Sequence, residues 1–282
     1  MIHVVLRLFQ IIYNDETQRQ RDTGFDVLDN MSNERPDWYE YWPIRNFFER
    51  DGIHDGDFYG FFSPKFFAKT GLTRERLDSV IATDDLKAVF LFSPFLDASA
   101  LFLNQIEQGQ TAHPGLLDAF ARLYPRPAEA PPLVQTVTNT VYCNYFVASG
   151  AFWRDWLNET DKVFVPAENP HSRLGALLRG ETLHGGRLIA PMKVFCVERI
   201  VGTMLANDPR WHPVAPLAYQ MPTDGPRFSP FRPELIALDQ LKREAVRTGD
   251  YETHLRRYMA ERRALMARTA PRQDGQILPQ RQ

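Results

Sequence analysis

The sequence predicts an α/β fold, in which a mostly parallel sheet is flanked by helices and followed by a C-terminal helical extension. Three observations carry this prediction. Runs of aliphatic and aromatic residues recur at 3–9, 87–94 and 141–149, as the buried strands of a parallel sheet require. Segments with helical character separate these runs, and that alternation is typical of parallel sheets. After residue 222 the composition becomes charged and helical.

The first part of the chain predicts two strands and a helix between them. Residues 3–9 (HVVLRLF) are rich in β-branched and aliphatic side chains and predict a buried strand. Residues 35–52 have helical spacing of their aromatic residues, with Gly52 as the stop. Residues 56–66 (GDFYGFFSPKF) predict a strand that ends at Pro64, because proline cannot donate to a strand ladder.

The middle of the chain predicts several helices. Residues 72–82 predict a helix with Thr73 as its N-cap. Residues 98–125 predict two helices that are broken between Gly109 and Pro114. Further helices, each following an apolar run or containing one, are predicted at 150–164 and 188–208.

The composition predicts three parts of unequal size. Residues 1–222 form the α/β domain, residues 223–270 a helical extension, and residues 271–282 a disordered tail. The helical segment at 233–270 is compatible with packing on its own domain, with a dimerisation arm, or with a membrane-surface element.

Charge and cysteine content restrict the partners and the compartment. The formal net charge of -2 gives no electrostatic reason to expect a nucleic-acid partner. Cys143 and Cys196 are the two cysteines, and they predict buried thiols in a reducing compartment rather than a disulfide framework. The apolar N-terminal run is too short to cross a bilayer, so the sequence predicts a cytoplasmic protein, with a peripheral position at the inner membrane face as the alternative.

Polar residues at or near the ends of the apolar runs are the first candidates for a binding site. The sequence contains no glycine-rich phosphate loop, no G-x-S-x-G, no H-E-x-x-H and no C-x-x-C. In an open α/β sheet, ligands bind beyond the carboxyl ends of the strands, where such residues collect. Asn144 is set within the strand predicted at 141–149. The full set comprises Gln10, Asn14, Ser63, Lys65, Lys69, Ser93, Asp97 and Asn144.

Five segments between residues 36 and 206 occur in an order that carries a family resemblance. The first, at 36–66, places Glu40, Trp42 and Asn46 before a strand with Asp57 and a Tyr-Gly pair. The others are VFLFSPFLD, HPGLLDAFARLYP, YCNYFVASGAFWRDWL and VFCVERIVGTML. Together they resemble bacterial capsule and O-antigen glycosyltransferases of the GT-A type, where W-x-W-K-N precedes D-Y-I-G-x-x-H-Y-R-R. Where that family has His-Tyr-Arg-Arg, this chain has Ser-Pro-Lys-Phe at 63–66.

The resemblance implies a GT-A-like fold and an enzyme of the hexosyltransferase type. Such an enzyme moves a sugar from a nucleotide-diphosphate sugar to a cell-surface polysaccharide or a lipid-linked acceptor. Its partners are therefore a nucleotide-sugar donor and a glycan or glycolipid acceptor. A homodimer and peripheral membrane contact are both compatible with the late helical segment.

The chemistry of glycosyl transfer assigns roles to the candidate residues. A diphosphate leaving group needs neutralising charge, for which Lys65 and Arg199 are candidates, with Lys69 behind them. An acceptor hydroxyl in an inverting enzyme needs a carboxylate base, for which the candidates are Asp97, Glu198 and Glu40. The remaining donor- and substrate-binding candidates are Gln10, Asn14, Asp57, Ser63, His113 and Asn144, whose amide can both donate to and accept from a sugar hydroxyl.

Several of these residues have a structural alternative. Glu198 and Arg199 are also compatible with an ion pair or cap on a helix surface, and Glu40 with a buried acid bonded to backbone. Asn144 would satisfy a backbone group at a bulge, and His113 would serve a structural role at a helix end.

Metal dependence and catalysis itself are left open by the sequence. No metal-binding D-x-D is assigned, and the adjacent aspartates of TDDL at 83–86 precede their strand, so dependence on a Mn²⁺ or Mg²⁺ cofactor stays open. The loss of the basic tandem favours a second hypothesis, a non-catalytic transferase-like domain that binds glycan or a partner enzyme in polysaccharide assembly.

Overall fold

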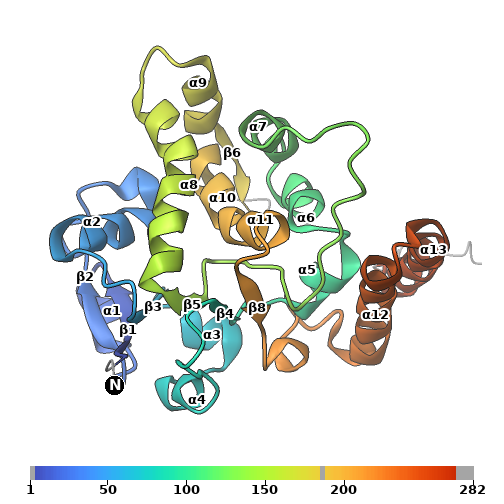
Figure 1. Cartoon of the computed structure of the whole chain (residues 1–282), viewed down its shortest axis with the longest axis horizontal. Helices are drawn as coiled ribbons and strands as arrows, with labels where there is room; N and C mark the ends of the chain where they lie inside the picture. The colour runs from blue at the N-terminus through green and yellow to red at the C-terminus, as the bar shows by residue number, and fades with distance from the viewer. Residues whose placement is uncertain (1–3, 185–187, 271–282) are drawn as a thin grey trace, which may run out of the picture.

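The computed structural model describes residues 4–184 and 188–270, and within them a six-stranded sheet in the order β2-β1-β3-β5-β4-β8 runs through the protein (Figure 1). Its strands are β1 (Leu6–Ile12), β2 (Asp26–Asp29), β3 (Phe58–Phe62), β4 (Ala88–Leu91), β5 (Phe146–Ser149) and β8 (His212–Val214). β1 is parallel to β2 and β3, and β4 is parallel to β8, whereas β5 is antiparallel to both β3 and β4. The predicted mostly parallel sheet is confirmed. The tail predicted to be disordered, 271–282, lies outside the described residues.

The helices alternate with the strands along most of the chain. Those of the first half are α1 (Asp15–Arg19), η1 (Pro36–Trp38), α2 (Tyr41–Asp51), α3 (Phe66–Thr70), α4 (Arg74–Asp78), α5 (Leu96–Leu101), α6 (Gln105–Ala112) and α7 (Leu116–Leu123). Those of the second half are α8 (Gly150–Glu168), α9 (Arg173–Arg179), α10 (Met192–Glu198), α11 (Ile200–Asn207), η2 (Ala218–Gln220), η3 (Ser229–Phe231), α12 (Arg232–Thr248) and α13 (Tyr251–Thr269). A two-stranded hairpin, β6 (Glu181–His184) and β7 (Leu188–Pro191), stands apart from the main sheet.

The two faces of the sheet are covered by different helices, because successive side chains of a strand point in opposite directions. Tyr59 and Phe61 of β3 belong to a core shared with α2 and α8, whereas Phe58 and Phe62 belong to a core shared with α3 and α4. Figure 1 shows these two pairs of helices on opposite sides of the sheet.

Helix α8 packs against the sheet through its tryptophans. Trp153 and Trp156 are fully buried. The indole Nε1 of Trp153 donates to the carbonyl oxygen of Tyr59 at 2.9 Å, and its ring meets Phe61 edge-on at 5.0 Å. The hydrogen bond satisfies the polar end of a buried indole, so this side chain fixes the distance between α8 and the central strands.

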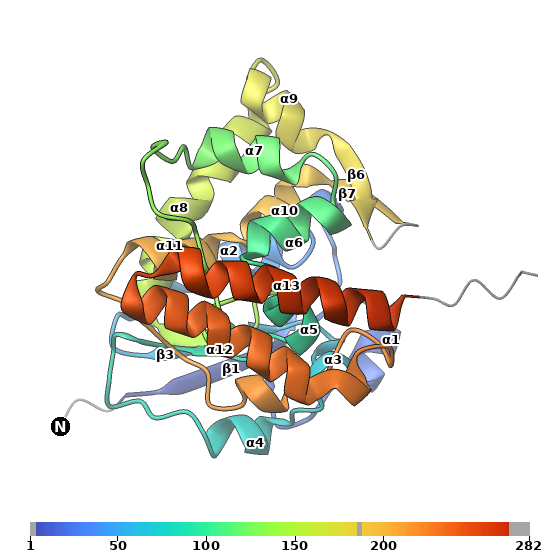
Figure 2. The ribbon, with the colours of Figure 1, turned by 90° about the vertical axis from the view of Figure 1, so that its right-hand side faces the viewer.

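Helices α12 and α13 pack antiparallel on each other and against α5 (Figure 2). The buried Lys242 of α12 donates to the carbonyl oxygens of Ser99 and Phe102 at 2.5 and 2.8 Å, at the end of α5. Tyr258 of α13 donates to the carbonyl oxygen of Ala100 at 3.1 Å. Of the arrangements compatible with the sequence, packing on the chain's own domain is therefore the one observed. No helix in the described part of the chain is long and apolar enough to cross a membrane.

Two predictions about individual elements are wrong. Residues 98–125 were predicted to hold two helices with a break between Gly109 and Pro114; that break is present, between Ala112 and Leu116, but a further break separates α5 from α6, so the segment holds parts of three helices. The side chain of Asn104 causes that break by accepting from the backbone N–H groups of Ile106 and Glu107, which caps α6. Asn144 does not lie within a strand, because β5 begins two residues later, at Phe146.

Candidate functional site

The direction of β5 brings four chain segments to one edge of the sheet. β5 is antiparallel to β3 and β4, with Gly60 opposite Val147 and Leu91 opposite Phe146. The amino end of β5 therefore lies beside the carboxyl ends of β3 and β4. Residues after β1, after β3 and after β4 share this edge with residues 142–145, which precede β5.

Hydrogen bonds between these segments confirm that they are adjacent. The hydroxyl groups of Ser63 and Tyr145 lie 2.5 Å apart, which joins the residue after β3 to the residue before β5. The backbone N–H of Tyr142 donates to the hydroxyl of Ser93 at 2.7 Å, which joins the segment after β4 to the same turn. This is the edge at which open α/β sheets bind ligands.

A group of charged and polar side chains collects at this edge. Lys69 donates from Nζ to Sγ of Cys143 at 3.1 Å. Burial by itself would lower the pKa of Lys69, but the Cys143 sulfur and the carboxylates of Glu198 and Glu40 outweigh burial and raise it. Lys65 also lowers the pKa of Glu40. The name Glu40–Lys69 cluster stands for five residues: Glu40, Lys65, Lys69, Cys143 and Glu198.

Within the cluster, Glu40 is a carboxylate whose pKa is raised. Its side chain lies at the start of α2, and burial raises its pKa, as does the nearby negative charge of Glu198. Its own backbone N–H, Lys69 and Lys65 act in the opposite direction but do not cancel the rise. A carboxylate with a raised pKa is a better proton acceptor at neutral pH than an ordinary one.

Tyr13, which follows β1, faces the same charges. Burial raises the pKa of its hydroxyl, and Glu40 and Glu16 raise it further, while Lys69 lowers it. Tyr13 and Cys143 were not among the candidates from sequence. The signal for Tyr13 is its position directly after a buried strand, whereas for Cys143 the sequence indicates no more than a buried thiol.

Glu198 and Arg199 occupy the junction between α10 and α11. Arg199 is almost completely buried, and its Nη1 donates to the carboxylate of Glu198 at 2.6 Å. Its Nη2 donates to Oε1 of Gln108 on α6 at 3.1 Å, and its carbonyl oxygen accepts from Gln105 at 2.6 Å. Arg199 is therefore a buried structural cation rather than an exposed residue of a helix surface, and its role is to hold Glu198.

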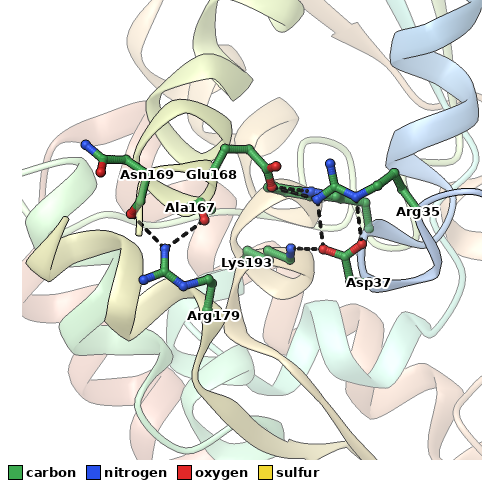
Figure 3. A network of polar contacts seen from close by, with 8 residues as sticks. Arg35, Asp37, Ala167, Glu168, Asn169, Arg179 and Lys193 are labelled. Atoms are coloured by element: carbon green, nitrogen blue, oxygen red, sulfur yellow. Dashed lines mark hydrogen bonds and ion pairs between the residues drawn. The ribbon is translucent and has the colours of Figure 1, made fainter. Parts of the chain in front are cut away.

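Figure 3 shows the network that sets the distance between the start of α2 and α10. Asp37 accepts two hydrogen bonds from Arg35, at 3.0 Å each, and pairs with the buried Nζ of Lys193. Arg35 and the indole of Trp38 both donate to Glu168, at 2.7 and 2.9 Å. Asp37 precedes Glu40 by three residues and Lys193 belongs to the helix that ends at Glu198, so the network positions both carboxylates of the cluster.

Left-handed backbone conformations surround the cluster. Tyr39, Cys143 and Asn144 have φ values of 49°, 60° and 53°, and Phe95, two residues before Asp97, has 70°. Residues other than glycine rarely adopt this conformation, and each instance costs on the order of 1–3 kcal/mol. Such residues collect at functional sites because the surrounding structure holds them there.

Asn144 faces this edge from the turn before β5. It is nine-tenths buried, and within the described residues its Oδ1 accepts no hydrogen bond. The alternative role of Asn144, to satisfy a backbone N–H group at a bulge with its Oδ1, is therefore not observed. A buried acceptor without a donor is costly, so a ligand hydroxyl or amide at this position would stabilise the turn.

Asp97 and Lys65 differ in burial and in their partners. Asp97 is buried and accepts from the backbone N–H of Asp224 at 2.8 Å, and burial raises its pKa. Its carboxylate thus anchors the segment after η2. Lys65 is exposed at the start of α3, where its ammonium is available to an anion.

Four other predicted site residues have structural partners of their own. Gln10 accepts from the backbone of Asp22 at 2.9 Å, and Asn14 caps α1 by accepting from the backbone of Thr17 at 2.8 Å. Asp57 lies at the amino end of β3, at the opposite edge of the sheet, where it accepts from the backbone of Val5 at 3.1 Å. His113 lies after α6, with Nδ1 2.9 Å from the carbonyl oxygen of Leu183 and its ring stacked on Phe195.

Two cavities of the protein lie away from the cluster. One, of about 1010 Å³, lies between α6, α7 and α11, and the other, of about 380 Å³, lies between α8 and α11. Neither is lined by a residue of the Glu40–Lys69 cluster. Within residues 4–184 and 188–270, no three His, Cys, Asp or Glu side chains are grouped as metal ligands.

Comparisons with protein-family models, with curated proteins and with solved structures find no match to this chain.

Proposed function

We propose that this protein is a glycosyltransferase, which moves a sugar from a nucleotide-diphosphate sugar to a cell-surface polysaccharide or lipid-linked acceptor. The observation that carries the proposal is the electrostatic interaction of Lys69 with Glu40 and Glu198 near the carboxyl edge of the sheet. Cations and a carboxylate of raised pKa are the two kinds of group that this reaction requires. The resemblance over residues 36–206 supports the same assignment.

The lysines are assigned to the leaving group. When the bond between the sugar and the diphosphate breaks, negative charge develops on the diphosphate, and nearby cations stabilise the transition state. Lys65 is exposed and Lys69 is half-buried behind it, so the two can contact successive phosphates. The interaction of Lys69 with Glu198 and Glu40 keeps its ammonium charged, because those carboxylates raise its pKa.

Glu40 is assigned to the acceptor. A carboxylate whose pKa is raised by burial and by Glu198 takes a proton more readily from an attacking hydroxyl. Glu198 then acts through its charge on Glu40 and is a positioning residue, held by the buried Arg199. Asn144 supplies an unpartnered acceptor for a sugar hydroxyl at the same edge.

A second candidate, a non-catalytic domain that binds glycan or a partner enzyme, is favoured by a specific observation. Ser63 is bonded to Tyr145, and Lys69 to Cys143, so part of the polar edge is satisfied internally. Turnover separates the two candidates, since both predict binding but only a transferase releases nucleotide.

The test is a survey of UDP-, GDP- and CMP-sugars, with and without Mn²⁺, that measures nucleotide release and sugar transfer to a glycan acceptor. We expect turnover with one donor class, and we expect Glu40→Gln to lower kcat by about 10²–10⁴-fold, the usual contribution of a general base. Glu49→Gln, an exposed carboxylate on the same helix, is the matched control and should retain full activity. Binding of a donor without release of nucleotide would favour the non-catalytic candidate.

A further inference from the structure

The larger cavity, of about 1010 Å³, is bounded by elements that the proposed reaction does not use. Its apolar wall is formed by Ile106 of α6, Leu117 and Phe120 of α7, Leu133 of the following segment and Ala206 of α11. Its volume is at the upper end of the range that small-molecule sites occupy. Leu117 is 57% exposed, which is unusual for a leucine that lines a hollow and indicates apolar surface still available for burial.

The charges around this cavity leave one cation without a counterion. Glu107, the carboxylate of the lining, accepts from Arg262 at 2.7 Å and from the backbone of Leu103 at 2.6 Å. Lys162 pairs with Glu159 at 2.7 Å. Arg126 donates to the carbonyl oxygen of Pro131 at 2.8 Å, and no ion pair joins it to a carboxylate within the described chain.

An apolar hollow with one uncompensated guanidinium complements a particular chemistry. The apolar wall favours a hydrocarbon chain, because burying methylene groups is the main source of affinity in such a site. The guanidinium of Arg126 favours a single anionic group, such as a carboxylate or a phosphate, which it can bind with two parallel hydrogen bonds. The lining of the adjoining smaller cavity contains three carboxylates, Asp155, Glu159 and Asp208, against two cations, Lys162 and Arg210, so its net negative charge disfavours an anion at that end.

We propose that the cavity between α6, α7 and α11 binds a single-chain amphipathic anion, with its hydrocarbon against Ile106, Leu117 and Phe120 and its head group on Arg126. Fatty acids and alkyl or isoprenyl phosphates share this chemistry. The site is separate from the Glu40–Lys69 cluster, because its lining contains none of the cluster residues. The proposal therefore does not depend on the transferase assignment.

Titration calorimetry with octyl phosphate, decyl phosphate and decanoate, each as monomer in solution, tests this site on the full chain. One methylene contributes about a fourfold gain in affinity, so decyl phosphate should bind about sixteenfold more tightly than octyl phosphate. Decyltrimethylammonium and inorganic phosphate should bind far more weakly, because each lacks one of the two required features. A preference for decanoate over decyl phosphate would identify a fatty acid, and the reverse a lipid phosphate.

Variants separate the cavity from the outer surface. Ala121→Trp, on the cavity side of α7, should abolish binding by filling the hollow, and Arg126→Gln should weaken phosphate binding at least tenfold. The control is Arg122→Gln, which removes an exposed arginine of α7 that does not line the cavity. This variant should bind decyl phosphate as tightly as the original chain. Circular dichroism checks that each variant is folded.

Three results would overturn the proposal: no binding of decanoate or of either alkyl phosphate, equal binding of the cationic amphiphile, or unchanged binding by a folded Ala121→Trp variant. Sedimentation with vesicles of anionic phospholipid provides an independent readout. If Arg126→Gln lowered vesicle binding and Ala121→Trp did not, Arg126 would serve a membrane surface and the cavity would not be the site.

Discussion

Lys69 donates to the sulfur of Cys143 at 3.1 Å, although 74 residues of sequence separate the two side chains. Lys69 lies at the end of α3, and Cys143 lies in the left-handed turn before β5. Burial raises the pKa of the Cys143 thiol to about 11, with a further contribution from Glu198, while Lys69 acts to lower it. The pair connects the two chain segments that flank the proposed diphosphate site.

The thiols should be unreactive at ordinary pH. A thiol with a pKa of about 11 is thiolate in roughly one part per thousand at pH 8, and burial raises the pKa of Cys196 to about 12. We therefore expect slow alkylation of both by iodoacetamide at pH 8, measured by mass spectrometry. The rate at the half-buried Cys143 should climb with pH and be slower in Lys69→Met, which loses the stabilising cation. Rapid alkylation of Cys143 in the folded protein at pH 7 would rule out this environment.

Glu198 should control the proton affinity of Glu40. The carboxylate of Glu198 raises the pKa of Glu40 through its negative charge, so Glu198→Gln should lower that pKa. Carbon-detected NMR titration of the glutamate carboxyl groups measures the change. Glu49→Gln, on the exposed face of α2, should leave the Glu40 titration where it is. An unchanged Glu40 titration in Glu198→Gln would mean that the two carboxylates are not adjacent.

Lys242 should make the protein more stable as the pH rises above 8. Burial lowers the pKa of Lys242 to about 8, and the positive charge of Arg262 also lowers it. Asp239 and Glu107 act in the opposite direction but do not cancel the effect of burial. Between that value and its unfolded pKa of about 10.4, the unfolded chain binds more protons, so the free energy of unfolding increases with pH by up to about 1.4 kcal/mol per unit. Urea denaturation at pH 7.5, 8.5 and 9.5 measures this slope. Lys242→Met should reduce it, and an identical slope in both proteins would refute the assignment.

Asp37 should be the most sensitive member of the network in Figure 3. Arg35 and Lys193 lower its pKa to about 2 against the effect of burial, which raises it. The stability from this pairing is present above the unfolded pKa of about 3.9 and is lost as the pH falls from 4 toward 2. Because the Asp37 side chain is 41% exposed, solvent screening reduces its contribution.

Asp37→Asn leaves the buried Lys193 without its anion, and we expect it to cost about 1–3 kcal/mol of unfolding free energy at pH 7. Asp78→Asn, which breaks an exposed helical pair with Arg74, should cost well under 1 kcal/mol. Equal losses in the two variants, measured by urea denaturation, would argue against a special role for Lys193.

The outline of the sheet could be predicted from the sequence because its signals are local. The apolar runs that form β3, β4 and β5 are continuous, and that of β1 is interrupted only by Arg7 and Gln10. Gly52 ends its helix and Thr73 begins its helix, as predicted. The sequence also contains the signal for the start of α6, because Asn104 followed by Glu107 is a pattern typical of helix N-termini. The apolar residues on either side of Asn104 nevertheless favoured one continuous helix.

The arrangement of the site was less accessible, because it depends on long-range pairing. The antiparallel direction of β5 brings Cys143 and Asn144 to the carboxyl edge of β3, and no local pattern in residues 141–149 encodes that direction. The motif at 57–60 makes Asp57 a candidate, yet Asp57 precedes β3 and therefore lies at the opposite edge of the sheet. The burial of Arg199 likewise depends on Gln105 and Gln108, about ninety residues earlier in the chain.

The most direct test of the central claim is the thermal stability of the protein with UDP, GDP and CMP, compared between the original chain, Lys69→Met and Lys87→Met. Lys87 is an exposed lysine that precedes β4, at the opposite edge of the sheet, and serves as the matched control. A nucleotide at ~100 times its dissociation constant should stabilise the protein by about 2.7 kcal/mol. We predict this stabilisation for one diphosphate in the original chain and in Lys87→Met, and its loss in Lys69→Met. The absence of stabilisation by every nucleotide, or its persistence in Lys69→Met, would contradict a diphosphate site at the Glu40–Lys69 cluster.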